Sequence, residues 1–521
     1  MKKLLVLAMM ATLLMAGSAF AAHPKSLTPN ATFQFGVGGA AFGPSTTNND
    51  DSCDISVAPA ATLLLPYFEV DFTSPQSTAR TTLFTITNTS RVPQIAHVTV
   101  WTDWSFPILD FNIFLTGYDV QSINLYDMLN RGIIAPGTPP GTSIDVDAPD
   151  FVATAGSNPL ANTANPNFLP TAASRCAAGL LPGNIPPTNL ADLRTALTTG
   201  LYSGCGATRV GGTHTNAIGY ITMDVAATCS TSLPTTSSYF STEILFDNVL
   251  IGDYQDINPN ATTGNYAGGN PMVHIRAIPE GGPAGSIPAP SITNLPYTFY
   301  DRYTAAPLAL RTIDRRQPLP STFAARYIQG GTGDFTTRYK MWREGVTGAS
   351  LTCSTFAANS NLPIAEVVRF DEHENSFIPG TGVVISPPPP GQPGTAETQA
   401  VLTSSSLFPQ NSGTADIAGW MYLNLNNLGS LNYSSQRAGF SGPATSTTIG
   451  TRQSQNWVIV SMFAEGRYSV DFDAAWLGNG CSPSPAAGST IGPAGGTPVC
   501  PPNVAGCTPG VAPYIGTNTT P

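Results

Sequence analysis

The densest cluster of acidic side chains in the chain is the run Asp371-Glu372-His373-Glu374-Asn375. Carboxylate and amide oxygens are the ligands that calcium prefers, and about six to eight of them surround each ion. The run has neither the spacing nor the glycine of an EF-hand loop, so we favour a solvated turn. Calcium is the alternative, with Asp371, Glu372 and Glu374 as its candidate ligands, and no other cofactor is predicted.

Two pairs of carboxylates are placed where acid–base chemistry could use them. Asp471 and Asp473, and likewise Glu69 and Asp71, stand two residues apart and so share one face of an extended strand. A pair of carboxylates is the machinery of glycoside hydrolysis. Because two groups on one strand rarely lie on opposite sides of a sugar bond, we predict no catalytic residue at either pair.

The histidines do not indicate a metal site or a catalytic site. The five histidines form no H-E-x-x-H or H-x-H pair; they are His23, His97, His214, His274 and His373. His97 and His274 fall in strand-like segments and are expected to be ordinary face residues. The chain also lacks a G-x-S-x-G elbow, a phosphate loop and a dinucleotide fingerprint.

The tryptophans stand in strand-like segments, where core packing is the expected role. Stacking on sugars is the alternative for any that are exposed. The six are Trp101, Trp104, Trp342, Trp420, Trp457 and Trp476.

Eight cysteines are candidates for disulfide bonds: Cys53, Cys176, Cys205, Cys229, Cys353, Cys481, Cys500 and Cys507. Their even number suits an oxidising compartment, although sequence alone does not decide the pairing. Local spacing suggests the bridges Cys176–Cys205 and Cys500–Cys507, which leave Cys53–Cys229 and Cys353–Cys481. The spacings include no C-x-x-C, which argues against structural zinc and thiol redox chemistry.

The first 21 residues resemble a secretory signal in their arrangement. Lys2 and Lys3 precede an apolar run over residues 4–15, and Ala19-Phe20-Ala21 provides the small residues of a cleavage site. We therefore expect export to the extracellular space, the cell surface or the periplasm. No later stretch reaches the ~18 to 20 apolar residues of a spanning helix, so no transmembrane helix is predicted.

The amino-acid composition limits the classes of binding partner that the chain would suit. Removing Lys2 and Lys3 with the leader would take the formal net charge from −10 to −12. Nucleic acid is an unsuitable partner, since phosphate binding requires clustered Lys and Arg. Charged residues make up only 10% of the chain, against about 25% in an average domain. A surface covered by Ser, Thr, Asn, Gln, Gly and Pro is common on secreted proteins, and a protein or glycan surface is the compatible partner.

The strongest periodic pattern is that of β-strands. Segments that alternate β-branched or aromatic residues with polar ones are separated by turn signals, as in an antiparallel sandwich. Ala96, Val98 and Val100 should face a core, with His97 and Thr99 on the opposite face. The predicted strands are 81–88, 95–101, 111–115, 120–125, 217–225, 243–252, 272–277, 322–328, 335–342, 418–425, 457–463 and 468–472.

One helix interrupts the strands. Leu190, Leu193 and Leu197 share a face near residues 188–200, Thr188 or Asn189 could cap the start, and Gly200 should end it. The predicted organisation is a signal peptide over 1–21, a low-complexity arm over 22–52, a β-sandwich with this helical insertion over 53–277, a linker or loop over 278–296, a second β-sandwich with a Pro-rich loop at 387–394 over 297–481, and a flexible tail over 482–521.

Several segments resemble a group of uncharacterised secreted bacterial proteins. They are residues 63–71, 88–90, 101–104 and 114–118, and more weakly 473–481. The resemblance implies a shared fold and export, and it carries no activity and no site residues. A strand, an Asn-x-Ser turn and a second strand are also similar to immunoglobulin-like modules, as an analogy of fold alone.

The sequence thus predicts an all-β protein with one or two antiparallel, immunoglobulin-like β-sandwich domains. Its expected role is non-catalytic binding or assembly at or beyond the cell surface, of the adhesion, matrix or surface-layer type. An extracellular hydrolase of polysaccharide or another polymer is the first alternative. An outer-membrane β-barrel is the second.

Overall fold

The structure is a computed structural model. It describes residues 57–90, 94–134, 184–206, 208–226, 247–259, 266–277, 322–330, 335–343, 366–372, 376–377, 399–403, 418–425, 455–464 and 468–477, with single positions or short stretches between 229 and 245 and at 299, 300, 316, 319, 320 and 353. The predicted arm, linker, Pro-rich loop and tail lie outside these residues.

Strands dominate the described residues. They are β1 (Thr62–Val70), β2 (Thr81–Asn88), β3 (Gln94–Thr102), β4 (Pro107–Leu115), β5 (Val120–Asn124), β6 (Leu201–Tyr202), β7 (Thr208–Arg209), β8 (Ala217–Ala226), β9 (Leu250–Asn258), β10 (Tyr266–Pro271), β11 (Val273–Ile275), β12 (Thr322–Ile328), β13 (Phe335–Arg343), β14 (Glu366–Asp371), β15 (Ser376–Phe377), β16 (Gln399–Thr403), β17 (Ala418–Asn424), β18 (Asn456–Ala464), β19 (Tyr468–Asp473) and β20 (Ala475–Trp476). The helical elements are η1 (Asp127–Arg131), α4 (Pro187–Thr199) and η2 (Ser203–Cys205).

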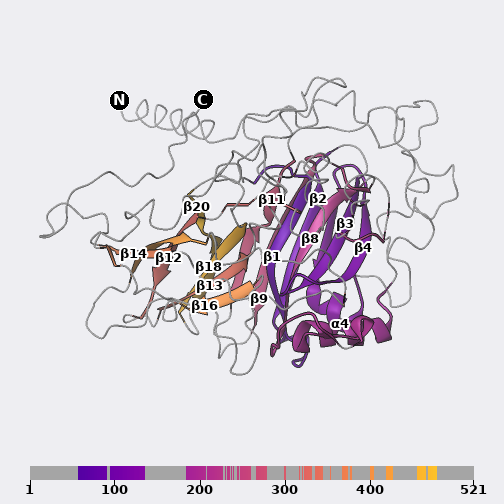
Figure 1. The fold of residues 1–521 in the computed structure, drawn as a ribbon, viewed down its shortest axis with the longest axis horizontal. Helices are drawn as coiled ribbons and strands as arrows, with labels where there is room; N and C mark the ends of the chain where they lie inside the picture. Colours follow the sequence, from indigo (N-terminus) through magenta and orange to yellow (C-terminus); the bar gives the residue numbers. More distant parts are fainter. Residues whose placement is uncertain are drawn as a thin grey trace, which may run out of the picture.

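Apart from β6 and β7, which pair with each other in a small two-stranded sheet, the strands form two pairs of antiparallel sheets (Figure 1). The N-terminal sheet pair has the strand orders β11-β1-β8-β3-β4 and β10-β9-β2-β5. The C-terminal sheet pair has the orders β15-β14-β17-β12-β20 and β16-β13-β18-β19. The all-β prediction is confirmed at the level of several antiparallel sheets with few helices.

Burial follows the predicted alternation in some strands and exceeds it in others. In β2 every second side chain is buried, with Phe84 and Ile86 in the core. In β3 every side chain is buried, so His97 and Thr99 are covered as completely as Val98. The expectation of one core face and one polar face therefore describes β2 correctly, whereas β3 lies between two covered faces.

Two local predictions are wrong. The strand predicted over 243–252 is β9, which begins only at Leu250, and before it Ile244 forms an isolated bridge to Ala226. The helix α4 has its predicted buried face and ends at Gly200, whose φ of 72° suits glycine, but it starts at Pro187 with no side-chain cap. Pro187 lacks the N–H that a cap would satisfy, which lessens the need for Thr188 or Asn189.

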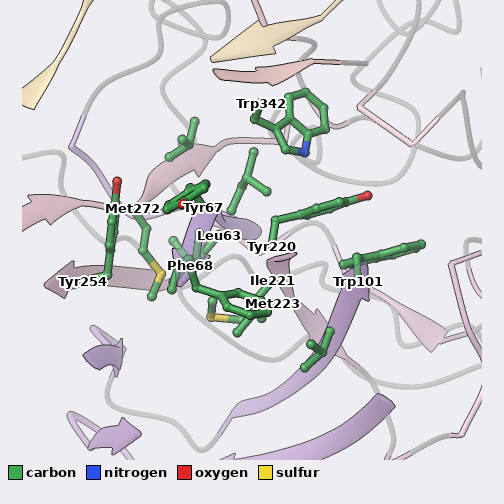
Figure 2. Close-up of a cluster of buried hydrophobic side chains, with 14 of the residues drawn as sticks. Leu63, Tyr67, Phe68, Trp101, Tyr220, Ile221, Met223, Tyr254, Met272 and Trp342 are labelled. Carbon is green, nitrogen blue, oxygen red and sulfur yellow. The ribbon is translucent and has the colours of Figure 1, made fainter. Parts of the chain in front are cut away.

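Aromatic side chains pack the two sheet pairs together (Figure 2). Trp101 of β3 stacks on Tyr220 of β8 with ring centroids 5.7 Å apart. Trp342 of β13 meets the edge of Tyr220 at 6.0 Å and stacks on Phe299 at 5.7 Å. Trp342 is 1% exposed, so one continuous hydrophobic core crosses from the N-terminal to the C-terminal pair.

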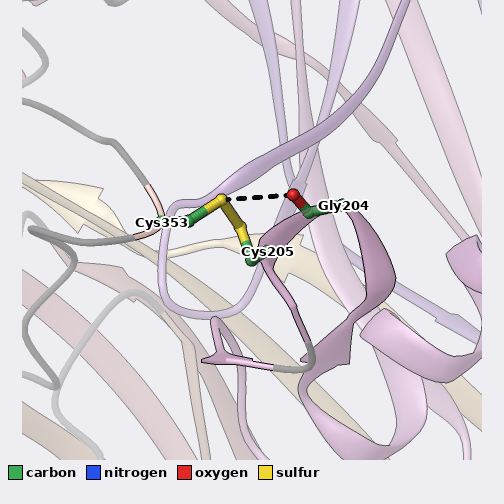
Figure 3. Close-up of a disulfide and its surroundings, with 3 residues drawn as sticks. All are labelled: Gly204, Cys205 and Cys353. Atoms are coloured by element: carbon green, nitrogen blue, oxygen red, sulfur yellow. Dashed lines mark hydrogen bonds between the residues drawn. A yellow bond between two sulfur atoms is a disulfide. The ribbon is translucent and has the colours of Figure 1, made fainter.

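A disulfide bond adds a covalent tie. Cys205, in the turn after α4, is bonded to Cys353, and Cys353 Sγ lies 3.7 Å from the carbonyl oxygen of Gly204 (Figure 3). The predicted bridges Cys176–Cys205 and Cys353–Cys481 are therefore wrong, because local spacing misses a partner 148 residues away. Cys229 is also disulfide-bonded. Cys53, Cys176, Cys481, Cys500 and Cys507 lie outside the described residues.

We expect Trp342→Ala to destabilise the protein by about 3–5 kcal/mol, because it empties the contact between the two sheet pairs. The matched control is Trp420→Ala, which removes a side chain that is 37% exposed and should cost less than ~1 kcal/mol. Urea unfolding followed by circular dichroism measures both. Equal losses in the two variants would contradict the role of Trp342 in the shared core.

Candidate functional site

Charged side chains gather where the two sheet pairs meet, and we refer to Glu69, Arg80, Asp256, Lys340 and Asp471 as the charged seam. Arg80 bonds Glu69 at 2.7 Å and Asp256 at 2.8 Å. The ammonium of Lys340 lies 2.6 Å from Asp256 Oδ2 and 3.0 Å from Asp471 Oδ2. Since Asp256 belongs to β9 and Lys340 to β13, this ion pair joins the N-terminal pair to the C-terminal pair.

The part of the seam around Lys340 is buried, whereas the side chains of Arg80 and Glu69 are 13% and 14% exposed. The side chains of Lys340, Asp256 and Asp471 are 4%, 1% and 1% exposed. Tyr67 donates to Glu69 at 2.7 Å, and its ring centroid lies 5.2 Å from the Lys340 ammonium. A buried ammonium is tolerated only where carboxylates and an aromatic face replace its hydration.

The charges of the seam set the protonation of Asp256. Burial alone would raise the pKa of its carboxyl group, but the positive charges of Arg80 and Lys340 outweigh burial and hold the pKa well below its usual range. Asp256 is therefore ionised at every physiological pH. A carboxylate that stays ionised can stabilise the fold through its ion pairs, but it cannot donate a proton.

Asp473 lies beside the seam and behaves in the opposite way. Burial raises the pKa of its carboxyl group to about 7, with a further contribution from the negative charge of Asp471, although a hydrogen bond from Trp457 acts against the rise. Trp457 Nε1 donates to Asp473 Oδ1 at 3.0 Å. The carboxylate pair noted in the sequence thus has one member ion-paired with Lys340 and one that holds a proton near neutrality.

A second polar group crosses the sheet that contains β3. Thr62, Asp224, His97 and Asn112 are paired neighbours on β1, β8, β3 and β4, and we call them the polar row. Each is at most 1% exposed. His97 Nδ1 lies 3.0 Å from Asn112 Oδ1, while its Nε2 has no hydrogen-bond partner among the described residues.

Asp224 is the centre of the polar row. Its Oδ1 accepts a hydrogen bond from Thr62 and lies 3.4 Å from Arg316 Nε. Its Oδ2 accepts hydrogen bonds from Tyr239 at 2.6 Å and Tyr300 at 2.5 Å. Burial, and then the charge of Asp224, raises the pKa of both tyrosines well above the usual value. Through Asp224 the row ties Tyr239, Tyr300 and Arg316, which come from distant parts of the chain, to this sheet.

His214 and Asp103 form the only described arrangement that resembles part of a catalytic triad. His214 Nε2 lies 2.7 Å from Asp103 Oδ2, and Asp103 Oδ1 accepts a hydrogen bond from the backbone N–H of Gly212 at 2.9 Å. Burial lowers the pKa of His214, but the hydrogen bond and charge of Asp103 and the charge of Glu69 raise it overall. A triad would also need a nucleophile bonded to the histidine, and within the described residues no serine or cysteine is hydrogen-bonded to His214.

The candidate calcium ligands are only partly described. Asp371 is buried at the end of β14, Glu372 is exposed in the following turn, and Glu374 lies outside the described residues. In the part of the chain that the structure covers, no three His, Cys, Asp or Glu side chains are placed to hold a metal ion. Calcium at this run stays a prediction.

Other candidate residues have clear positions. His274 is buried in β11, and burial lowers its pKa to about 4 despite a hydrogen bond to the Met272 carbonyl, so it is uncharged at neutral pH. Trp101, Trp104, Trp342 and Trp457 are buried as predicted, whereas Trp420 and Trp476 are each 37% exposed. His23 and His373 lie outside the described residues.

Comparison with protein families, with curated proteins and with solved structures found no match to this chain. Among the described helices, none is long and apolar enough to cross a membrane.

We expect Lys340→Met to destabilise the protein by about 3–5 kcal/mol, because it leaves the buried carboxylate of Asp471 without its cation. The double variant Lys340→Met/Asp471→Asn should recover part of the loss, since it removes the uncompensated charge. Arg131→Ala is the control, because the Arg131 side chain is 49% exposed. A loss below ~1 kcal/mol for Lys340→Met would show that the seam does not hold the sheet pairs together.

Asp473 should make stability depend on pH. A carboxyl group with a folded pKa of about 7 binds its proton more tightly than in the unfolded chain, where the pKa is about 3.9. Its stabilising contribution is complete below pH ~4 and is lost as the pH rises from ~4 to ~7.

Asp473→Asn should therefore stabilise the protein at pH 8 by roughly 1–3 kcal/mol and flatten the difference between pH 5 and pH 8. Urea midpoints at the two pH values measure the effect. Asp471→Asn, which removes the partner of Lys340, should instead destabilise at both. An unchanged pH profile in Asp473→Asn would refute the assignment.

Proposed function

We propose that this protein is exported and acts outside the cytoplasm as a non-catalytic binding or assembly protein. In this proposal the two sheet pairs are immunoglobulin-like β-sandwiches, locked together as one body. The leader-like first 21 residues and the disulfide Cys205–Cys353 support an oxidising location. The resemblance to secreted bacterial proteins is consistent with it.

One observation carries the non-catalytic part of the proposal. Three buried carboxylates that could otherwise serve a reaction are engaged in internal bonds that hold the fold: Asp256 and Asp471 with Lys340, and Asp224 with two tyrosines. Each of these carboxylates is at most 5% exposed. Catalytic groups must reach a substrate, whereas these ones close the interior.

Polymer hydrolysis is the second candidate, and Asp473 is the observation that favours it. A carboxyl group with a pKa of about 7 could donate a proton to a glycosidic oxygen. Its neighbour Asp471 is ion-paired with Lys340 at 3.0 Å, which makes it a poor nucleophile or base. Binding is therefore the function that the arrangement supports better.

The proposal is tested by fractionating the producing cells and by adding purified mature protein back to cells and extracellular matrix. We expect the protein outside the cytoplasm, and we expect washed cells or matrix to retain it at saturable levels. Retention by neither would overturn binding. Release of reducing sugar ends from matrix polysaccharide, abolished in Asp473→Asn but not in Trp476→Ala, would establish the hydrolase instead.

A further inference from the structure

The C-terminal sheet formed by β15, β14, β17, β12 and β20 has two faces with different surroundings. Phe323, Ala325 and Met421 point into the main core. Residues that alternate with them belong to the opposite, outer face. There Val368 and Tyr422 form a small separate cluster against Phe370 and Leu477, so the outer face has its own packing.

Three side chains are aligned across this outer face, and we call them the aromatic–cationic row. Phe370 of β14 is paired with Trp420 of β17, and Trp420 is paired with Arg326 of β12. The rings of Phe370 and Trp420 are stacked, with centroids 4.6 Å apart and planes 15° from parallel. Phe370 thus supports one face of the Trp420 ring.

The backbone is shaped to allow this stacking. Gly419 precedes Trp420, and a Cβ atom added to it would lie 2.0 Å from the carbonyl oxygen of Phe370. Only glycine lets β17 approach β14 so closely at this point. On the same face, the neighbours of the row along β12 and β17 are Ala324 and Ile328, and Ala418 and Tyr422.

Trp420 and Arg326 keep their polar groups available. Trp420 is 37% exposed, and Arg326 is also exposed. Within the described part of the chain, neither the Trp420 indole N–H nor the Arg326 guanidinium has a hydrogen bond or an ion pair. This contrasts with the buried cations Arg80, Arg316 and Lys340, each of which is matched to a carboxylate.

We propose that the aromatic–cationic row binds a pyranose sugar that carries a carboxylate, as in an acidic extracellular polysaccharide. The apolar C–H face of the sugar packs on Trp420, the indole N–H donates to a hydroxyl, and Arg326 pairs with the carboxylate. The guanidinium is suited to this role because it can donate two parallel hydrogen bonds to a carboxylate. This inference rests on the proposed binding function and assigns it a ligand class and a site.

The size of the row favours a sugar over a protein partner. A stable protein interface buries about 800 Å² on each side, and the row offers one partly exposed ring and one cation. That surface matches a single sugar unit, and repeated units of a polymer supply avidity. The formal net charge of −10 opposes polyanions at long range, so binding should be weak for one short oligomer.

Isothermal titration of the full mature protein with short oligogalacturonates tests the proposal, with cello-oligosaccharides as the neutral probe. We expect Trp420→Ala and Arg326→Ala each to weaken oligogalacturonate binding by about tenfold or more. Cello-oligosaccharides should bind at least ~10-fold more weakly than oligogalacturonates and should not respond to Arg326→Ala. Trp476→Ala, equally exposed at 37%, and Arg131→Ala are the matched controls and should bind normally.

Three results would overturn the inference: no titration with oligogalacturonate, titration that survives both Trp420→Ala and Arg326→Ala, or retention of matrix proteins through Trp420 without sugar binding. Urea midpoints of each variant exclude misfolding as the cause of a loss. If cells or matrix retain the protein while oligogalacturonate does not bind, the ligand class and site are wrong and the proposed function stands. If neither retains it, the proposed function fails as well.

Discussion

The burial of the Lys340 charge is the constraint on which the arrangement of the two sheet pairs depends. An ammonium ion removed from water must be matched by carboxylates, and its two partners come from different sheet pairs: Asp256 from β9 and Asp471 from β19. Neither pair supplies a complete environment alone. Arg80, the residue before β2, and Glu69 of β1 extend the same bonding within the N-terminal sheet pair. The hydrophobic contacts of Trp342 hold the two sheet pairs together. The ion pairs of Lys340 determine the relative orientation of the two sheet pairs.

Local patterns predicted much of this fold because local chemistry decides it. The alternation in β2 and the leucine spacing of α4 report burial directly, and both are present. Predictions failed where distant segments decide the outcome. His97 belongs to a strand covered on both faces, and no pattern within β3 reveals Tyr239 above it. The segment over 243–249 is apolar enough for a strand, but its described residues make only the isolated bridge from Ile244 and scattered backbone hydrogen bonds, such as that from Leu245 N–H to the Val225 carbonyl.

In the candidate sites, too, the sequence predicted features that depend on neighbouring residues and missed those that depend on distant strands. The sequence identified Asp471 and Asp473 as a pair on one strand face, but it shows neither the ion pair of Asp471 with Lys340 nor the burial that raises the pKa of Asp473, because both depend on other strands. The sequence did not identify Arg326 as a candidate binding residue, because a single arginine in a strand forms no motif. Its position beside Trp420 is known only once β12 and β17 are paired. A partial signal existed in composition: in a chain with 10% charged residues, each charge inside a strand is a candidate for a specific partner.

The disulfide between Cys205 and Cys353 also bears on how the chain is made. The bridge spans 148 residues, so during synthesis from the N-terminus the thiol of Cys205 is present long before its partner. Cys176 and Cys229 are synthesised before Cys353 and are closer to Cys205 along the chain. Oxidation in order of synthesis would therefore join the wrong cysteines. Thiol–disulfide exchange would then have to replace those bonds before the native pair could form.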